Sequence, residues 1–384
     1  MSFWKNLSGA AQLLCVVLPA ALALDFVSTH YFLHEPGQFN PILDLVIASP
    51  IAMVVGYFTL PHGAMRFHEL KDLDWFSLVL LAVGLASLLL GLKDAPSMGW
   101  LSLRVVFWFG LSLICAFAMW QRPNPAVMFH LLKDRPLRFG CILSFLAGFV
   151  LYGSVYLIPV FMAFVRGHSP LEIGKCTLVI GITQLLAAAP SVQVDRFFNA
   201  RWLALIGFSV FGVGLFMNAG LDVTSDYDAH FWPQVVRGLG VTLCLLPAIR
   251  FALALMPLDK IGDASGLFNV SRNIGGAIGI AMIDTLMFSR RPIYVEGISD
   301  LMNIDMPKAA KILGIALKDM PALDDAMGVI SIQESVQQAG LTMAINDCWL
   351  LMGGVCLIAV PVILLLGPVR SALPAWKLNQ KATV

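Results

Sequence analysis

The sequence predicts an all-α integral membrane protein with about ten transmembrane helices. Of its 384 residues, 58% are hydrophobic and 13% are charged, and this charged fraction is about half that of an ordinary soluble domain. Apolar runs close to the roughly 20 residues that a membrane-crossing helix needs recur along the whole chain. So few charges could not coat the surface of a soluble enzyme of this length.

Ten segments are the predicted spans. Eight contain no charged residue, and the other two surround Arg250 and Arg272. The uncharged spans are 6–24, 45–65, 75–92, 105–121, 139–165, 176–194, 202–221 and 348–369, and the other two are 233–256 and 265–289. Backbone polar groups find no partners in lipid, so we expect each span to be a helix.

The distribution of positive residues predicts the orientation. With the N-terminus inside, the short inner segments carry thirteen lysines and arginines, and the short outer loops carry four. Both termini are therefore predicted to be cytoplasmic. Lys5 and the apolar stretch ending in Ala21-Leu22-Ala23 also resemble a secretory signal, and its cleavage would leave nine spans in the same orientation.

Several functional classes lack support in the sequence. The net charge of +1 gives no basic surface for nucleic acid. The seven cysteines lie apart in apolar runs and are interpreted as small packing residues, with neither a disulfide framework nor a metal site. We find no HExxH or nucleophile motif, so no catalytic residue, metal ligand or cofactor is predicted.

Two connections stand out by composition. Residues 122–138 contain three prolines and four basic residues, and they separate four spans from six. The polar outer connection 290–347 contains residues 307–317, in which lysines alternate with isoleucine and leucine. That pattern predicts either a short amphipathic helix on the outer membrane surface or a plain solvated helix.

The segment 264–282 carries the most polar residues of any predicted span. At 100° per residue, Asn269, Arg272, Asn273 and Gly276 form one stripe. Gly275 and Gly279 form a G-x-x-x-G ridge beside it, which favours close approach of a neighbouring helix. The stripe lines a water-filled cavity or a moving contact. Alternatively, Arg272 snorkels to the inner interface and the asparagines bond across helices for packing alone.

Two acidic residues lie near the outer ends of spans, where charge is costly. Asp25 follows the first span, and Asp284 shares the face of Asn273. Each is either a proton-carrying group or an interfacial residue. In the second interpretation we expect Asp284 to pair with Arg290 or Arg291.

Three further polar residues interrupt apolar spans. Arg237 is expected to pair with an acidic residue of loop 222–228, and Arg250 to snorkel inward. Gln184 lies mid-span, where a pore-lining role and an interhelical hydrogen bond fit equally well.

The inner loop Asp195-Arg196-Phe-Phe-Asn-Ala-Arg201 places an acid before two basic residues in a tight turn. Such a loop can pin two helix ends together at the cytoplasmic mouth. The general excess of Lys and Arg in cytoplasmic loops explains the same two arginines.

These segments resemble the major facilitator superfamily, specifically its fourteen-span drug:proton antiporter branch. ASGLFNVSRNIGGAIGIAM (264–282) is similar to the eleventh helix of that branch, VDRFFNARW (194–202) to the second copy of its cytoplasmic gating loop, and VYLIPVFMAFVRGHSPLEIG (155–174) to the end of its seventh helix. The resemblance is strongest over residues 139–289. It implies a C-terminal six-helix bundle at 139–369, two linker spans in 67–122, a cytoplasmic linker at 123–138 and a tail at 370–384.

On this resemblance, residues 1–66 supply only two spans of the N-terminal bundle, and the first four helices of the family are missing. The family implies a substrate cavity near Asn269, Arg272, Asn273, Gln184 and Tyr156, with Asp195, Arg196 and Arg201 as the gating loop. It also implies proton coupling, for which Asp25 and Asp284 are the candidates.

Two functions follow as expectations. The first is proton-coupled efflux of small amphipathic molecules across a bacterial inner membrane, with a periplasmic adaptor or a second chain as partner. The second is a truncated, non-transporting membrane protein or partner subunit.

Overall fold

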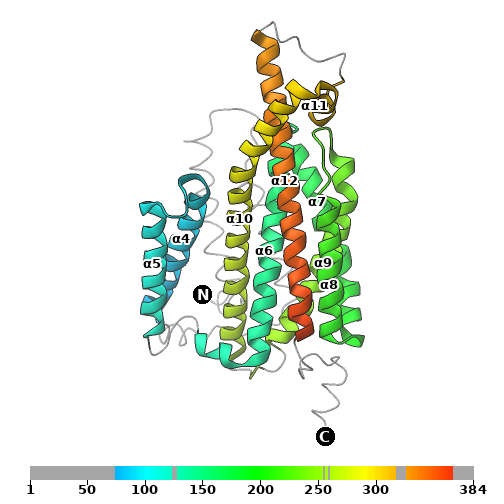
Figure 1. Cartoon of the computed structure of the whole chain (residues 1–384). Helices are drawn as coiled ribbons and strands as arrows, with labels where there is room; N and C mark the ends of the chain where they lie inside the picture. Colours follow the sequence, from blue (N-terminus) through cyan, green and yellow to red (C-terminus); the bar gives the residue numbers. More distant parts are fainter. Residues whose placement is uncertain (1–73, 123–127, 254–255, 258–259, 317–325, 366–384) are drawn as a thin grey trace, which may run out of the picture. The chain divides into compact units, whose positions relative to one another are not determined.

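The computed structural model describes residues 74–122, 128–253, 256–257, 260–316 and 326–365, which belong to one compact unit. Within these ranges the elements are all helices (Figure 1). Seven of the described helices are long and apolar enough to cross a membrane. The all-α membrane fold is therefore confirmed, while the predicted spans 6–24 and 45–65 and the tail 370–384 lie outside the described residues.

The first described helices are α4 (Trp75–Met98) and α5 (Leu103–Trp120), which pack against each other. Asp74 caps α4 by accepting a hydrogen bond from the backbone N–H of Ser77, at 3.3 Å. Arg122, just after α5, donates to both oxygens of the same carboxylate. The ends of the two helices are therefore fastened together, and the Arg122 hydrogen bond lowers the pKa of Asp74 well below its usual value.

Six long helices form the main bundle (Figure 1). They are α6 (Arg135–Phe164), α7 (Pro170–Phe197), α8 (Ala200–Met217), α9 (Tyr227–Leu253), α10 (Ile261–Ile304) and α12 (Ala326–Leu365). The closest pairs are α8 with α9 and α6 with α10, while α7 packs on α9, and α12 contacts α6, α8 and α10. Their shared core contains fully buried aromatic side chains, including Phe161, Phe208, Phe211, Phe251 and Trp349.

The predicted span 265–289 lies inside α10, which is less apolar than the seven span-like helices because it carries the polar stripe. At 1.5 Å per residue, the 44 residues of α10 measure roughly 66 Å and the 40 residues of α12 roughly 60 Å. Both lengths exceed the roughly 30 Å thickness of the hydrocarbon layer. Both helices therefore continue past the bundle, as Figure 1 shows at the end marked by α11.

The connection predicted at 290–347 is mostly helical. α10 runs on through Pro292 to Ile304, and α11 (Met306–Leu313) follows. Asp305 caps α11, and Gly314 ends it in a left-handed conformation (φ 69°). The last helical residue, Leu313, lies four residues before the predicted end at residue 317. We call α11 together with residues 290–304 and 326–347 the projection.

The apolar face of α11 faces protein. Ala309, Ala310 and Leu313 are buried, and Leu313 joins a second small core with Ile298 of α10 and Ile332 of α12. The apolar face therefore packs on protein, while Lys308 on the same helix is largely exposed. The short helix closes the core of the projection because its apolar side chains have partners there.

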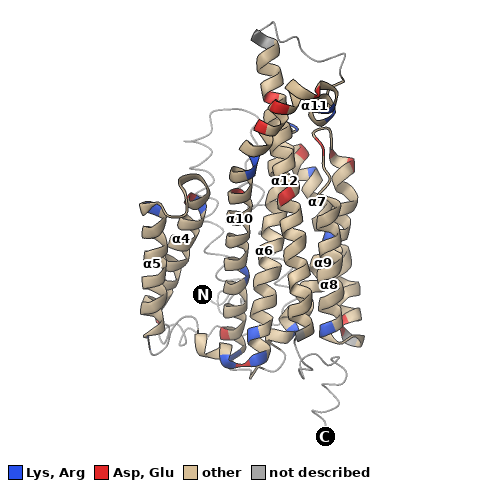
Figure 2. Ribbon diagram, viewed as in Figure 1, with Lys and Arg blue, Asp and Glu red and all other residues tan. Residues whose placement is uncertain are grey.

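Charged residues gather toward the two ends of the helices, and the middle stretches carry few of them (Figure 2). This is the distribution that a bilayer imposes, because a charge at its centre costs about 2.5–3.5 kcal/mol on insertion scales. The described cysteines, Cys115, Cys141, Cys176, Cys244, Cys348 and Cys356, are free and buried, as packing residues should be.

Candidate functional site

The contact between α6 and α10 is built on glycines. A Cβ at Gly275 would overlap the carbonyl oxygen of Phe145, and one at Gly279 would overlap that of Phe149. Gly148 of α6 lies equally close to the carbonyl oxygen of Arg272. The two backbones therefore meet along the predicted G-x-x-x-G ridge, with nothing but hydrogen atoms between them.

The polar stripe of α10 lies beside this contact. Arg272 Nη2 donates to Asn269 Oδ1 at 2.7 Å, and Asn269 Nδ2 donates to the carbonyl oxygen of Ser265 at 2.9 Å. Asn273 is exposed, and its Oδ1 accepts from the hydroxyl of Tyr152 on α6 at 3.2 Å. Gly276, placed on the stripe by the helical angle, is buried against the ring of Tyr152.

A second polar contact joins α6 and α10 about three turns further along α10. Tyr156 donates its hydroxyl hydrogen to Asp284 Oδ1 at 2.8 Å. The predicted ion pair between Asp284 and Arg290 or Arg291 is therefore wrong as a description of this carboxylate, because its partner is a neutral phenol. Arg290 faces Asp347 instead, at 3.7 Å.

Tyr156 and Asp284 open onto a cavity of about 280 Å³ between α6, α10 and α12. Arg291 and Gln338 also line it, and the rest of the wall is mainly apolar, including Phe164. The cavity brings one carboxylate, one phenol and one guanidinium to the same space. Such an arrangement can hold a proton on the carboxylate or release it beside a positive charge.

Two predicted site residues are not brought into this arrangement. Gln184 is half-buried on α7 and lines none of the cavities described in this section. Asp25 lies outside the described residues.

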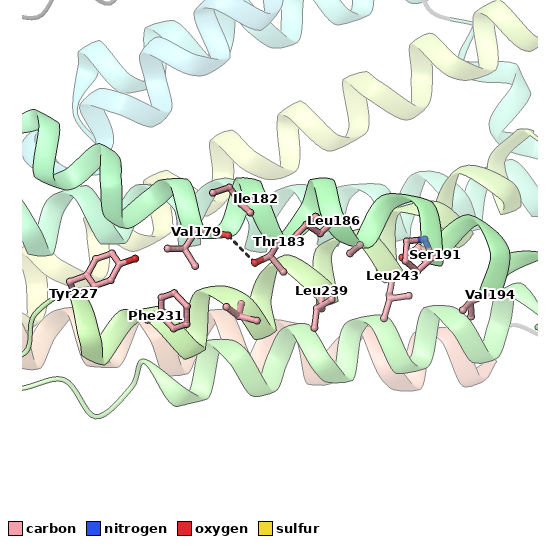
Figure 3. Close-up of a pocket in the computed structure, with 13 residues that line it drawn as sticks. Val179, Ile182, Thr183, Leu186, Ser191, Val194, Tyr227, Phe231, Leu239 and Leu243 are labelled. Carbon is pink, nitrogen blue, oxygen red and sulfur yellow. Dashed lines mark hydrogen bonds between the residues drawn. The ribbon is translucent and has the colours of Figure 1, made fainter.

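An apolar groove of about 690 Å³ runs between α7 and α9 (Figure 3). Its wall is aliphatic and aromatic, with Ile182 and Leu186 from α7 and Phe231 and Leu239 from α9. The hydroxyl of Thr183 is turned back to its own helix, where it donates to the carbonyl oxygen of Val179 at 2.9 Å (Figure 3). The groove therefore offers dispersion contacts and little hydrogen bonding.

The end of α7, which contains Asp195, and the start of α8, which contains Arg201, are fastened to two other helices. Arg250 Nη1 donates to Asp195 Oδ1 at 2.7 Å, and both side chains are nearly buried, at 10% and 13% exposure. Arg201 donates to the carbonyl oxygen of Leu364 at the end of α12. The acid of the loop therefore pairs with α9 and not with Arg201, while the side chain of Arg196 lies outside the described residues.

A cluster at the opposite end of the bundle ties the loop before α9 to the end of α6. Arg166 donates to Asp226 Oδ2 at 3.0 Å, and His168 Nε2 lies 2.9 Å from Oδ1 of the same carboxylate. Partial burial acts to raise the pKa of Asp226. The hydrogen bonds from Arg166, His168 and the Tyr227 backbone N–H outweigh it and lower that pKa to about 2.

Arg237 does not pair with this loop, which corrects the prediction made for it. The side chain is fully buried inside the bundle, and Nη1 donates to Gln234 Oε1 at 3.0 Å. The side chain of Arg237 lies on the face of α9 that packs against α8 and α12, and not on the face toward loop 222–228.

Three contacts of the candidate site could not be predicted from the sequence: Tyr152 with Asn273, Tyr156 with Asp284, and Asp195 with Arg250. Tyr152 precedes Tyr156 by one helical turn, so the pair was visible, but no sequence pattern says which neighbouring helix each tyrosine meets. The pairing of Asp195 with Arg250 joins residues 55 positions apart. Only the packing of α7 on α9 makes these two meet.

Comparisons with known proteins identify relatives of this chain. Residues 121–280 match the family model described as Major Facilitator Superfamily. The chain is 33% identical to the colistin resistance protein EmrB of Acinetobacter baumannii over 243 residues, covering 62% of this chain and 48% of that protein. It is 23% identical to the multidrug export protein EmrB of Escherichia coli over 326 residues, covering 82% of this chain and 62% of that protein.

A third relative is the fatty acid resistance protein FarB of Neisseria gonorrhoeae, 22% identical over 329 residues, or 83% of this chain and 64% of that protein. The chain thus spans about half to two thirds of the length of these curated relatives. The predicted resemblance is confirmed by the family match and by relatives that include multidrug export proteins. Over residues 121–280 this integral membrane chain matches the major facilitator superfamily, and the curated proteins that it resembles include multidrug export proteins.

Proposed function

We propose that this chain exports small amphipathic molecules across a bacterial inner membrane in exchange for protons, by alternating access, with both termini in the cytoplasm. The observation that carries the proposal is the half-open polar stripe of α10. Asn269, Arg272 and Asn273 place a guanidinium and amides within a helix that otherwise spans lipid. Such groups in a membrane are kept where they bind something or move.

The polar stripe supplies the binding contacts for the polar part of the substrate. Asn273 is exposed, and the Tyr152 hydroxyl bonds to its amide oxygen, so its amide nitrogen can donate to a ligand. The groove between α7 and α9 fits the apolar part of an amphipathic molecule, because its wall is aliphatic and aromatic (Figure 3).

Asp284 is the proposed proton carrier. Its carboxylate lies at a cavity and bonds to a neutral phenol, so protonation does not break an ion pair. Tyr156 holds the carboxylate at the α6–α10 contact, which links the protonation state to the packing of two helices. Asp25, the other proposed carrier, lies outside the described residues.

Asp195 and Arg201 form the proposed latch of the inner mouth, together with Arg196. The Asp195–Arg250 pair holds α7 to α9, and Arg201 holds α8 to α12. Opening the mouth requires these contacts to break, and their re-formation stabilises the closed state.

The projection is the proposed contact surface for a periplasmic adaptor or a second chain. It extends past the bundle, and its α12 segment exposes Gln333 and Glu334 beside Ile330. A mixed surface of this kind, held rigid by its own core, suits a protein partner.

An accumulation assay tests the proposal. Expression in an efflux-deficient bacterium is expected to lower the accumulation of a fluorescent amphipathic dye, and Arg272→Ala is expected to abolish the effect at equal membrane levels of protein. Arg104→Ala is the matched control, because Arg104 is a largely exposed arginine that pairs with Asp94 between α4 and α5.

Unchanged dye accumulation with normal membrane levels of the chain would contradict export by this chain alone. That result would favour the other predicted function, a non-transporting membrane protein or partner subunit.

A further inference from the structure

Arg237 lies in the interior of the main bundle with its charge fully buried. It is one of the largest side chains without exposed surface. Its stem packs on the backbone of α8 at Gly214, where a Cβ would come within 2.7 Å of Arg237 Cγ. The guanidinium carbon lies 5.0 Å from the ring centroid of Trp349 on α12. Three helices therefore enclose this charge.

The hydrogen-bonding capacity of Arg237 is mostly unused. Nη1 donates to Gln234, while Nε and Nη2 are buried without a partner. Among the described residues, no carboxylate forms an ion pair with this guanidinium. Asp226 is paired instead with Arg166 and His168. A buried charge without a counter-charge is strongly unfavourable.

The polar neighbours of Arg237 add more unpaired donors. Gln234 and His230 lie on the same face of α9, three and seven positions earlier. Asn218, at the end of α8, contacts His230, with 3.3 Å between Asn218 Oδ1 and His230 Nδ1. The amide nitrogens of Asn218 and Gln234 and the indole nitrogen of Trp349 are all buried without a partner.

The cluster therefore has one positive charge and more N–H groups than acceptors, because the amide oxygens of Gln234 and Asn218 are already bonded and the Cys176 thiol beside Gln234 is a weak acceptor. Buried donors in folded proteins are almost always paired, so a missing acceptor is expected there. A water molecule would accept hydrogen bonds but would bring two donors of its own, and it would leave the charge uncompensated. A carboxylate or phosphate compound is too large for a site whose polar residues are 0% exposed.

We propose that a small monovalent anion with the size and charge of chloride binds beside Arg237 and accepts hydrogen bonds from the unpaired donors around it. The anion ties α9 to α12, because the Arg237 guanidinium carbon lies 5.0 Å from the ring centroid of Trp349. This site is separate from the polar stripe of α10 and does not depend on the transport activity proposed above.

The anion dependence of unfolding tests the site. The full chain is purified in detergent in sodium gluconate, and thermal unfolding is followed with a thiol-reactive dye, since the described cysteines are buried in the folded state. Replacing gluconate by chloride or bromide at constant ionic strength is expected to raise the unfolding temperature with saturation, as ligand binding to the native state requires. Sulfate, which is larger and divalent, is expected to have no such effect. An unfolding temperature that does not respond to halide overturns the proposal.

Variants locate the response. Arg237→Gln is expected to remove the halide dependence, whereas the control Arg104→Gln, at a largely exposed ion pair, is expected to retain it. Trp349→Phe keeps the aromatic ring and deletes one donor, so it is expected to raise the halide concentration at half effect. If Arg237→Gln does not fold, the halide response of Trp349→Phe tests the proposal instead. A halide response that is unchanged in the folded variants places the anion elsewhere and overturns the proposal.

Discussion

Arg272 and Asn269 bond to each other within one helix, and this local pairing lowers the cost of placing a guanidinium in a membrane span. The distance of 2.7 Å is that of a strong, charge-assisted hydrogen bond. Arg272 Nε nevertheless remains buried without a partner. The residue is therefore only partly satisfied, which suits a group that binds a ligand and would be a defect in a purely structural one.

Asp284 gives a residue-scale prediction. Asp284→Asn keeps the side-chain size but cannot carry a proton, so we expect export driven by a pH gradient to fall to the level of empty liposomes. Dye release from proteoliposomes with an imposed gradient measures this. Asp300→Asn is the matched control, because Asp300 is an exposed acid on the same helix. Full gradient-driven export by Asp284→Asn would remove this residue from the coupling step.

The pair of Asp195 and Arg250 gives a second prediction at this scale. Both side chains are nearly buried, so Asp195→Ala leaves a guanidinium without its carboxylate and should destabilise the chain by about 3–5 kcal/mol. The midpoint of thermal unfolding in detergent reports the change.

The exchanged pair, Asp195→Arg with Arg250→Asp, restores opposite charges at the same place and should recover part of the lost stability. If the exchanged pair is no more stable than Asp195→Ala alone, the two charges do not act as a pair.

At the scale of the element, α6 and α10 are held by backbone contact. Gly279→Val puts a branched side chain against the carbonyl oxygen of Phe149, so we expect at least the 1–3 kcal/mol that overpacking usually costs. The measurement is the unfolding temperature in detergent.

Gly266→Ala on the same helix is the control for this substitution. Nothing lies within 4 Å of a Cβ at Gly266, so alanine should stabilise α10 by about 1 kcal/mol through helix propensity. Equal effects of the two substitutions would show that α10 does not approach α6 as closely as the structure has it.

α10 and α12 both continue beyond their predicted membrane spans. Residues 290–304 and 326–347 are polar enough to be recognised as extramembranous, yet they continue the helices of the spans. Pro292 does not end α10. Hydropathy indicates where the membrane ends, but it does not indicate whether the helix also ends there. The polar composition of residues 290–347 therefore predicts a loop.

For the whole molecule, the positive-inside count predicts which loops face which compartment. A membrane-impermeant maleimide applied to intact cells is expected to label Glu334→Cys in the projection and to leave Asn199→Cys unlabelled until the membrane is permeabilised. Both positions are exposed, and the parent chain, whose described cysteines are buried, gives the background. The reverse pattern would invert the orientation and place the projection in the cytoplasm, away from any periplasmic adaptor.

Much of this molecule could be predicted from the sequence. Seven of the predicted spans match described helices that are long and apolar enough to cross a membrane, and an eighth, 265–289, lies within α10. The close-packing ridge of Gly275 and Gly279 and the short helix near residue 310 also followed from local composition and periodicity. These features depend on the few residues around each position, because membrane crossing and helical faces are local properties.

The partners of the polar residues were decided only by the tertiary structure. Asp284 meets Tyr156, where Arg290 or Arg291 was the expected ionic partner, and Arg237 turns inward to Gln234, where loop 222–228 was expected. Asp195 meets Arg250, a partner that the sequence did not indicate. A side chain on a helix finds its partner through the crossing of two helices. That crossing is set by glycines and core packing along both helices, so it brings together residues 55 to 128 positions apart in the chain.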